Sequence, residues 1–163
     1  MIILGIDPGT AQMGWGIVEK KKAAGKSQKD RIKYVNHGMI KTSSKELLSK
    51  RLLIIKRGVE ELVNENKVEE IVIERVFFNV NKRSAISVAQ SYGVILLLAG
   101  ERDIPVYEYN ALEAKLLLAG HGRADKKLVQ LALKKKLRLK KHPTPVHSAD
   151  ALAIAVCHIE KQS

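Results

Sequence analysis

The chain begins with MIILGIDPG, residues 1–9, in which a short apolar run ends in Asp7 and is followed by Pro8 and Gly9. Such a run, stopped by a Pro-Gly pair, is typical of a buried strand that ends in a turn. An apolar pattern resumes over residues 14–19. We therefore expect two strands that pair as neighbours, with Asp7 at the end of the first.

The next segments alternate between strands and helices. Residues 20–31 are rich in lysine and lack apolar periodicity, which predicts a solvated hairpin loop before a third strand at about 32–41. Ser43, with Glu46 three residues later, predicts a capping box at the start of a long amphipathic helix. The β-branched run EIVIE, residues 70–74, follows that helical crossover, so we expect it to lie parallel to the first strand.

The second half of the chain is predicted to be mostly helical. Residues 84–100 form an apolar helix in which Ala85, Ala89 and Gly93 make a stripe of small residues four apart. Either burial in the core or the seam of a dimer explains this stripe, and we favour the seam. The α/β pattern is completed by a strand at 105–109 and by three shorter helices near 111–119, 126–137 and 146–159.

Composition limits the class of protein. Residues 1–163, with 45% hydrophobic content, are expected to form a single domain. The net charge of +12 favours a polyanionic partner, although a solvated basic surface is the alternative. Cys157 is the only cysteine, so no disulfide can form within the chain. Because Asp7 interrupts any signal-peptide core and no apolar run has membrane-spanning length, we expect a cytoplasmic protein with no membrane partner.

Two acidic residues stand where ligands bind in α/β proteins. Asp7 and Glu74 each end a predicted strand, and the two strands are expected to be parallel neighbours. Ligands usually bind outside the carboxyl ends of such strands. A single acid in this position is more often a turn or capping residue, but two at the same edge are better explained by a shared metal ion.

A third acid and a histidine come from the segment TPVHSAD, residues 144–150. Its first residue, Thr144, is predicted to cap a helix, and His147 and Asp150 lie three residues apart on one helical face. The alternative is that Asp150 only complements the helix N-terminus while His147 is exposed. The small apolar residues around Asp150 favour close packing on the sheet, where a buried acid needs a cation partner.

Three motifs together resemble the RuvC family of Holliday junction resolvases: GIDPGT around Asp7, IERVF around Glu74 and HSADALA from His147 onward. They occur in that family's order and spacing, and the similarity extends over nearly the whole chain. The resemblance implies an RNase H-like α/β fold, with a central five-stranded mixed sheet flanked by helices on both faces. It also implies an endonuclease that resolves four-way DNA junctions in recombination and repair by paired symmetric nicks, using two metal ions and leaving 5′ phosphates.

Carried over residue by residue, the resemblance implies that Asp7, Glu74 and Asp150 bind metal. His147 then occupies the fourth active-site position, where many members of the family have aspartate. Mg²⁺ is the expected ion, two per active site. Mn²⁺ is expected to substitute for it, because a neutral imidazole replaces one oxygen ligand. The sequence leaves open whether His147 binds metal directly or acts as a general base.

Aromatic and basic residues near these motifs are expected to contact DNA. Phe77 matches a family aromatic that stacks on junction bases, although core packing is the alternative. The densest basic run, residues 134–141, is either a solvated helix end or a track for a junction arm. Other basic residues are expected to bind backbone phosphates without reading sequence; they are Arg75, Lys82, Arg83, Lys115, Lys126 and Lys127.

The junction itself suggests how the protein assembles. A four-way junction has approximate twofold symmetry, so a homodimer with two identical active sites supplies the paired nicks. The family resemblance adds the branch-migration proteins RuvA and RuvB as partners.

Other functions agree less well with the motifs. A YqgF-like nuclease acting on RNA, or another RNase H-like enzyme, would share the fold, but IERVF and the chain length favour a junction resolvase. A junction-binding protein without catalysis gains nothing from clustered carboxylates. An actin-like ATPase needs two nucleotide-clasping domains, which 163 residues cannot supply.

Overall fold

The computed structural model describes residues 1–21, 31–75 and 82–162. Its strands form one five-stranded mixed sheet in the order β3-β2-β1-β4-β5. β1 pairs with β2 and lies parallel to β4, as predicted; the pairing with β2 is antiparallel, and β5 continues the parallel half. The strand bounds are β1 (Ile2–Asp7), β2 (Gln12–Lys21), β3 (Arg31–Lys41), β4 (Glu70–Glu74) and β5 (Val106–Tyr109).

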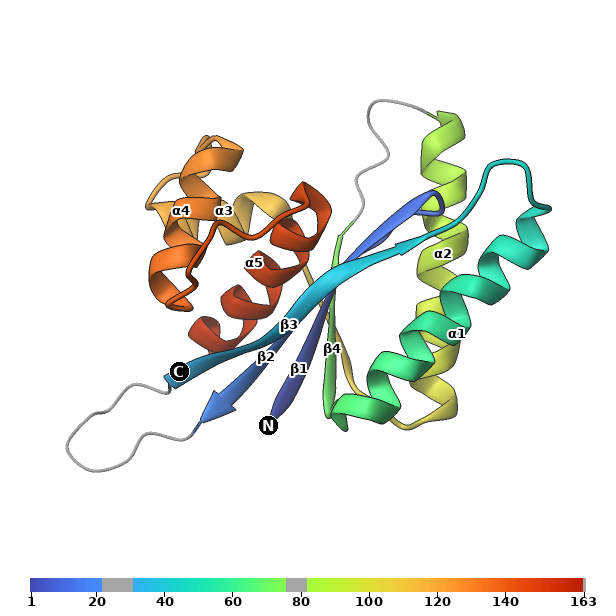
Figure 1. Ribbon diagram of the computed structural model, residues 1–163, viewed down its shortest axis with the longest axis horizontal. Coiled ribbons are helices and arrows are strands. Elements are labelled where there is room, and N and C mark those ends of the chain that lie inside the picture. Colours follow the sequence, from blue (N-terminus) through green and yellow to red (C-terminus); the bar gives the residue numbers. More distant parts are fainter. Residues whose placement is uncertain (22–30, 76–81, 163) are drawn as a thin grey trace.

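Helices cover both faces of the sheet (Figure 1), so the predicted architecture is confirmed. One face carries α1 (Leu48–Asn66) and α2 (Lys82–Glu101), and its core includes the fully buried Ile6 and Leu98. The other carries α3 (Ala111–Ala119), α4 (Lys126–Lys136) and α5 (Val146–Lys161) over a second core. Within the described residues, none of these helices combines the length and apolar character needed to cross a membrane.

The predicted capping box at Ser43 and Glu46 is wrong. α1 begins later, at Leu48, and its N-cap Leu47 makes no side-chain cap hydrogen bond. The Ser43 hydroxyl accepts a hydrogen bond from the backbone N–H of Lys45 (3.2 Å). Serine competes readily for backbone donors two residues ahead, and here that bond forms a turn before the helix.

The predicted loop at residues 20–31 is too long. β2 extends to Lys21, which pairs with Arg31 on β3, and residues 22–30 lie outside the described residues. Glu19 forms ion pairs with Lys21 (3.9 Å) and with Lys33 across the strand pair (3.5 Å). Opposite charges across strands stabilise a polar stretch of sheet that apolar periodicity does not reveal.

Two glycines allow α5 to approach the centre of the sheet. Gly5 on β1 lies opposite Gly16 on β2. A Cβ at Gly5 would lie 2.9 Å from the Ala155 Cβ and closer still to the Ala151 carbonyl oxygen, and one at Gly16 would lie 2.6 Å from the Leu152 Cγ. α5 therefore packs directly against the strand backbones.

Gly5→Ala is expected to destabilise the protein by about 1–3 kcal/mol, because the added methyl group overlaps α5 in a packed core. The matched control is Gly100→Ala, where a new Cβ in α2 meets no atom within 4 Å. That helical substitution should be neutral or stabilising by up to about 1 kcal/mol. Urea unfolding of both variants measures the difference, and equal midpoints would show that α5 does not need the glycine.

Candidate active site

Two carboxylates meet at one edge of the sheet. Ile6 on β1 is paired with Ile73 on β4, so Asp7 and Glu74, each the last residue of its strand, end side by side. The Asp7 side chain is only 17% exposed. This is the arrangement expected from two parallel strands that both end in an acid.

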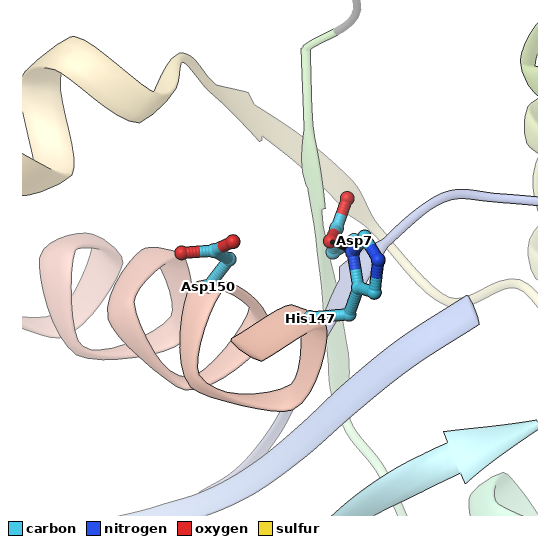
Figure 2. Close-up of side chains that lie close together, drawn as sticks. All are labelled: Asp7, His147 and Asp150. Carbon is cyan, nitrogen blue, oxygen red and sulfur yellow. Dashed lines mark hydrogen bonds and ion pairs between the residues drawn. The ribbon is translucent and has the colours of Figure 1, made fainter. Parts of the chain in front are cut away.

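The N-terminal part of α5 adds the histidine, in its first turn, and the third acid three residues later (Figure 2). Gly14, opposite Asp7, makes this approach possible, since a Cβ there would lie 2.8 Å from the His147 Cβ. The His147 Nδ1 lies 2.7 Å from the Asp7 Oδ2. Asp150 shares the same helical face, and one ligand atom from each of the three residues lies within 4.8 Å of the others. Three of the four predicted metal ligands, Asp7, His147 and Asp150, therefore converge. The fourth, Glu74, is not part of this group; it lies beside the group and lines one cavity with Asp7 and another with Asp150.

The predicted Thr144 cap is wrong. The N-cap of α5 is Pro145, one residue later, and no side chain caps the helix. The Thr144 carbonyl oxygen instead accepts a hydrogen bond from the His37 Nε2 on β3 (3.2 Å), while the Tyr34 hydroxyl donates to the His37 Nδ1 (2.9 Å). The segment before α5 is therefore fixed by a hydrogen bond from β3, and not by a cap from the Thr144 side chain.

The three acids lack full charge compensation. Burial raises the pKa of Glu74 to about 8, and the negative charges of Asp7 and Asp150 add to this effect. Burial also raises the pKa of Asp7, although a hydrogen bond to His147 partly offsets it, and the pKa of Asp150, where Lys126 has the offsetting role. A bound cation would favour the charged forms. Carboxylate oxygens with one imidazole suit Mg²⁺ or Mn²⁺, so these residues fit a divalent metal site.

Two predicted DNA-binding lysines lie beside the acids. The Lys126 Nζ is 3.7 Å from the Asp150 Oδ2. Lys115 and Lys126 line a small cavity together with Glu74 and Asp150. Lys127 is exposed at the start of α4, outside this cavity.

The remaining predicted DNA-binding residues differ in how they are placed. Arg75 lines a cavity of about 360 Å³ beside the carboxylates, but its Nε lies 3.1 Å from the Glu108 Oε2, so the Arg75 charge is paired. Phe77 lies outside the described residues. Lys82 and Arg83 form the first turn of α2, and their side chains are outside the described part as well.

Asn110 is a residue at this site that the sequence analysis missed. It lines the same 360 Å³ cavity and caps α3, accepting a hydrogen bond from the Glu113 backbone N–H (2.8 Å). The Glu113 carboxylate accepts one in return from the Asn110 N–H (2.9 Å). The Asn-x-x-Glu spacing at residues 110–113 is a capping-box signal that would have identified it.

Comparisons with known proteins agree with this geometry. The family model described as crossover junction endodeoxyribonuclease RuvC matches residues 3–158. RuvC of Desulfitobacterium hafniense is 42% identical over 158 residues, which cover 97% of this chain and 92% of that protein. The Thermus thermophilus RuvC structure has a TM-score of 0.87 and 34% identity, covering 99% of this chain and 96% of that one.

A second Thermus thermophilus structure, RuvC in complex with Holliday junction substrate, has the same TM-score with 36% identity, covering 97% of this chain and 92% of that one. The RNase H-like resolvase fold expected from the sequence is therefore confirmed. The chain belongs to the RuvC family of crossover junction endodeoxyribonucleases, nucleases of Holliday junctions in DNA recombination and repair.

Proposed function

We propose that this chain resolves Holliday junctions by metal-dependent hydrolysis, with Asp7, Glu74, His147 and Asp150 as its active site. The observation that carries the proposal is the convergence of Asp7, His147 and Asp150 at the end of β1, with the part-buried carboxylate of Glu74 beside them. The Thermus relative solved with a Holliday junction substrate supports the choice of DNA. Paired symmetric nicks that leave 5′ phosphates would be the product.

The cofactor we propose is Mg²⁺, two ions per active site, with Mn²⁺ as a substitute. Bound there, divalent ions would activate water and stabilise the charge of the scissile phosphate and the leaving oxygen. The carboxylates of Asp7, Glu74 and Asp150 supply the oxygen donors. The imidazole of His147 makes the set more tolerant of Mn²⁺ than carboxylates alone.

The contact between His147 and Asp7 suggests which histidine nitrogen reacts. With Asp7 ionised, the proton of a neutral imidazole lies on Nδ1 and is donated to the carboxylate (2.7 Å). Nε2 then has the free lone pair. We assign Nε2 as the atom that binds an ion or accepts a proton from the attacking water.

The basic residues are proposed to hold the DNA backbone at the carboxylates. Lys126 neutralises part of the Asp150 charge in the metal-free protein. When an ion compensates Asp150, Lys126 becomes available to a phosphate, and Lys115 lies in the same cavity. Lys127, exposed at the start of α4, and Arg75, which lines the 360 Å³ cavity, are proposed as further phosphate contacts. Phe77, Lys82 and Arg83 are proposed DNA contacts on the family resemblance.

The proposed homodimer uses the outer face of α2. Ala85 is buried (9% exposed), so the predicted small-residue stripe is partly core. Ala89 and Gly93 are exposed, as are the larger Ile86 (62%) and Leu97 (58%). Apolar residues at this spacing form one continuous stripe on a helix, and a second copy of the helix would cover it.

Further parts of the proposal rest on the family resemblance. Residues 1–163 would act as one nuclease domain in the cytoplasm. RuvA and RuvB would be the branch-migration partners that deliver the junction.

Asp7→Asn is expected to lower junction cleavage by at least about 100-fold, because the loss of one ligand charge disrupts the metal site. Junction binding should persist. Asp103→Asn is the matched control, since Asp103 is exposed and its positive φ of 53° suits asparagine. The assay compares a labelled four-way junction with a linear duplex in Mg²⁺, Mn²⁺ or chelator. Cleavage by wild type in chelator, or binding without cleavage in every metal, would contradict the proposal.

Glu74→Gln is expected to change the pH dependence of stability in the metal-free protein. The folded-state pKa of Glu74 is about 8, above its ordinary value of 4.5, so its charged form opposes folding. Between about pH 4.5 and about pH 8, Glu74 is ionised in the unfolded protein but protonated in the folded one. The free energy of unfolding is therefore highest below about pH 4.5 and falls as the pH rises through about 8. At about pH 9 in chelator, the variant should be more stable than wild type by about 1–3 kcal/mol.

Mg²⁺ should then stabilise wild type more than Glu74→Gln, since the charged carboxylate is what the ion favours. Thermal unfolding at about pH 6 and about pH 9 tests both statements. Glu65→Gln, an exposed position on α1, is the control. If the stability of wild type and Glu74→Gln depended on pH in the same way, Glu74 would not be a carboxylate with a raised pKa.

Leu97→Glu is expected to weaken the dimer by at least about 10-fold, because it places a charge in the apolar seam. Junctions should then be nicked once rather than on both strands. Leu131→Glu, on α4 and similarly exposed (53%), is the control. Sedimentation velocity measures assembly, and a wild-type dimer in Leu97→Glu would place the seam elsewhere.

A further inference from the structure

A second basic surface lies in a groove between the edge strand β3 and residues 137–144, which connect α4 to α5. Its volume is about 1250 Å³, compared with about 360 Å³ for the cavity at the carboxylates. Pockets for small molecules usually measure about 300–1,000 Å³. The groove is therefore large for a small ligand, and its occupant should be an extended one.

The connecting segment supplies most of the uncompensated charge. On the opposite wall Lys33 is paired with Glu19 (3.5 Å), and Lys136 at the end of α4 is paired with Glu160 (2.9 Å). Three further cations line the groove, and among the described residues no carboxylate pairs with them: Arg138, Lys140 and Lys141. Such an excess favours an anionic occupant with repeated charges.

Arg138 occupies a backbone position that normally takes glycine. It follows Leu137, the C-cap of α4, and has a φ of 53°. The Leu139 N–H bonds back to the Lys134 carbonyl oxygen (2.9 Å), which completes the helix-ending turn. A left-handed conformation is less favourable for arginine than for glycine, and it places the Arg138 side chain in the lining of the groove.

The groove leads away from the active site. Thr144 lines one end, three residues before His147, and the contact with His37 fixes it to β3. Lys21 lines the groove as well, seven residues along β2 from Gly14, which pairs with Asp7. At about 3.3 Å per residue this separates the Lys21 end from the Asp7 register by about 23 Å.

We propose that this groove binds the phosphate backbone of one junction arm beyond the cleavage site, with Arg138, Lys140 and Lys141 as its contacts. The inference rests on the proposed function and extends it from the cut site to the arm. The β3 wall of the groove runs from Ile32 to His37, about 17 Å at about 3.3 Å per residue. Duplex DNA carries one charge per about 1.7 Å of axis, so this wall faces several phosphates. An added peptide strand is disfavoured, because exposed lysines on β3, Lys33 and Lys41, oppose edge pairing.

The test is the triple variant Arg138→Gly, Lys140→Ser, Lys141→Ser. Glycine suits the left-handed position, so the variant should fold at least as well as wild type. The control triple Lys45→Ser, Lys50→Ser, Arg57→Ser removes the same charge from exposed positions at and before α1, which covers the other face of the sheet. Fluorescence anisotropy in chelator measures binding to a labelled four-way junction and to a linear duplex as salt is raised.

We expect the groove variant to bind the junction about 10-fold or more weakly at physiological salt, with the salt slope reduced by about 2.7 for three lost contacts. The duplex should show the same change in slope, while the control triple stays near wild type. At saturating enzyme the groove variant should still cleave in Mg²⁺, which separates this inference from the active-site proposal.

Unchanged affinity and slope in the groove variant, with cleavage intact, would overturn the inference and leave the proposed function standing. Equal losses in both triples would also overturn it, because only net charge would then matter. Loss of binding to an acidic protein, with DNA binding unchanged, would assign the groove to a protein partner instead.

Discussion

The active site depends on how closely α5 packs against β1 and β2. Gly5, Gly14 and Gly16 leave no side chain between this helix and the strands at three points of contact. On the helix side the contact uses small residues such as Ala151 and Ala155, both fully buried. Side chains at the first turn of α5 are thereby placed over the strand end that bears Asp7. A lateral shift of the helix by the width of one methyl group would separate the ligand atoms.

The same packing buries the carboxylates, so their ionisation costs free energy. Carboxylates removed from water resist ionisation, and their mutual repulsion adds to the effect at Glu74. Hydrogen bonding by His147 at Asp7 and the nearby ammonium of Lys126 at Asp150 offset only part of this cost, since both pKa values stay raised. A bound cation would therefore balance the negative charge of the carboxylates, in addition to any role in the reaction. The net charge of +12 does not supply this compensation, because most basic side chains are exposed to solvent and their charges are screened.

Periodicity in the sequence was enough to predict the strand order around β1 and the meeting of Asp7 with Glu74, since a helical crossover forces the parallel pairing. The position of His147 and Asp150 followed from helical spacing together with the family motifs. Local capping was predicted poorly. The hydroxyl of Ser43 bonds within a turn, and the Thr144 carbonyl is bound by His37, 107 residues away. Such contacts are set by tertiary structure, which a four-residue pattern does not contain. The groove at Arg138 was equally hidden, because only the folded chain brings the 137–144 segment beside β3.

The turn after Asp7 also connects the active site to α2. Thr10 is almost fully buried (3% exposed), and its hydroxyl donates to the Ser87 carbonyl oxygen in the first half of α2 (2.5 Å). The Thr10 carbonyl oxygen in turn accepts from the Thr42 hydroxyl just beyond β3 (2.5 Å). The turn that follows the first carboxylate and the helix of the proposed dimer seam are therefore joined by a hydrogen bond. If two copies pair through α2, the orientation of the helices fixes the orientation of the two active sites, and a twofold junction can meet both without either site having to move.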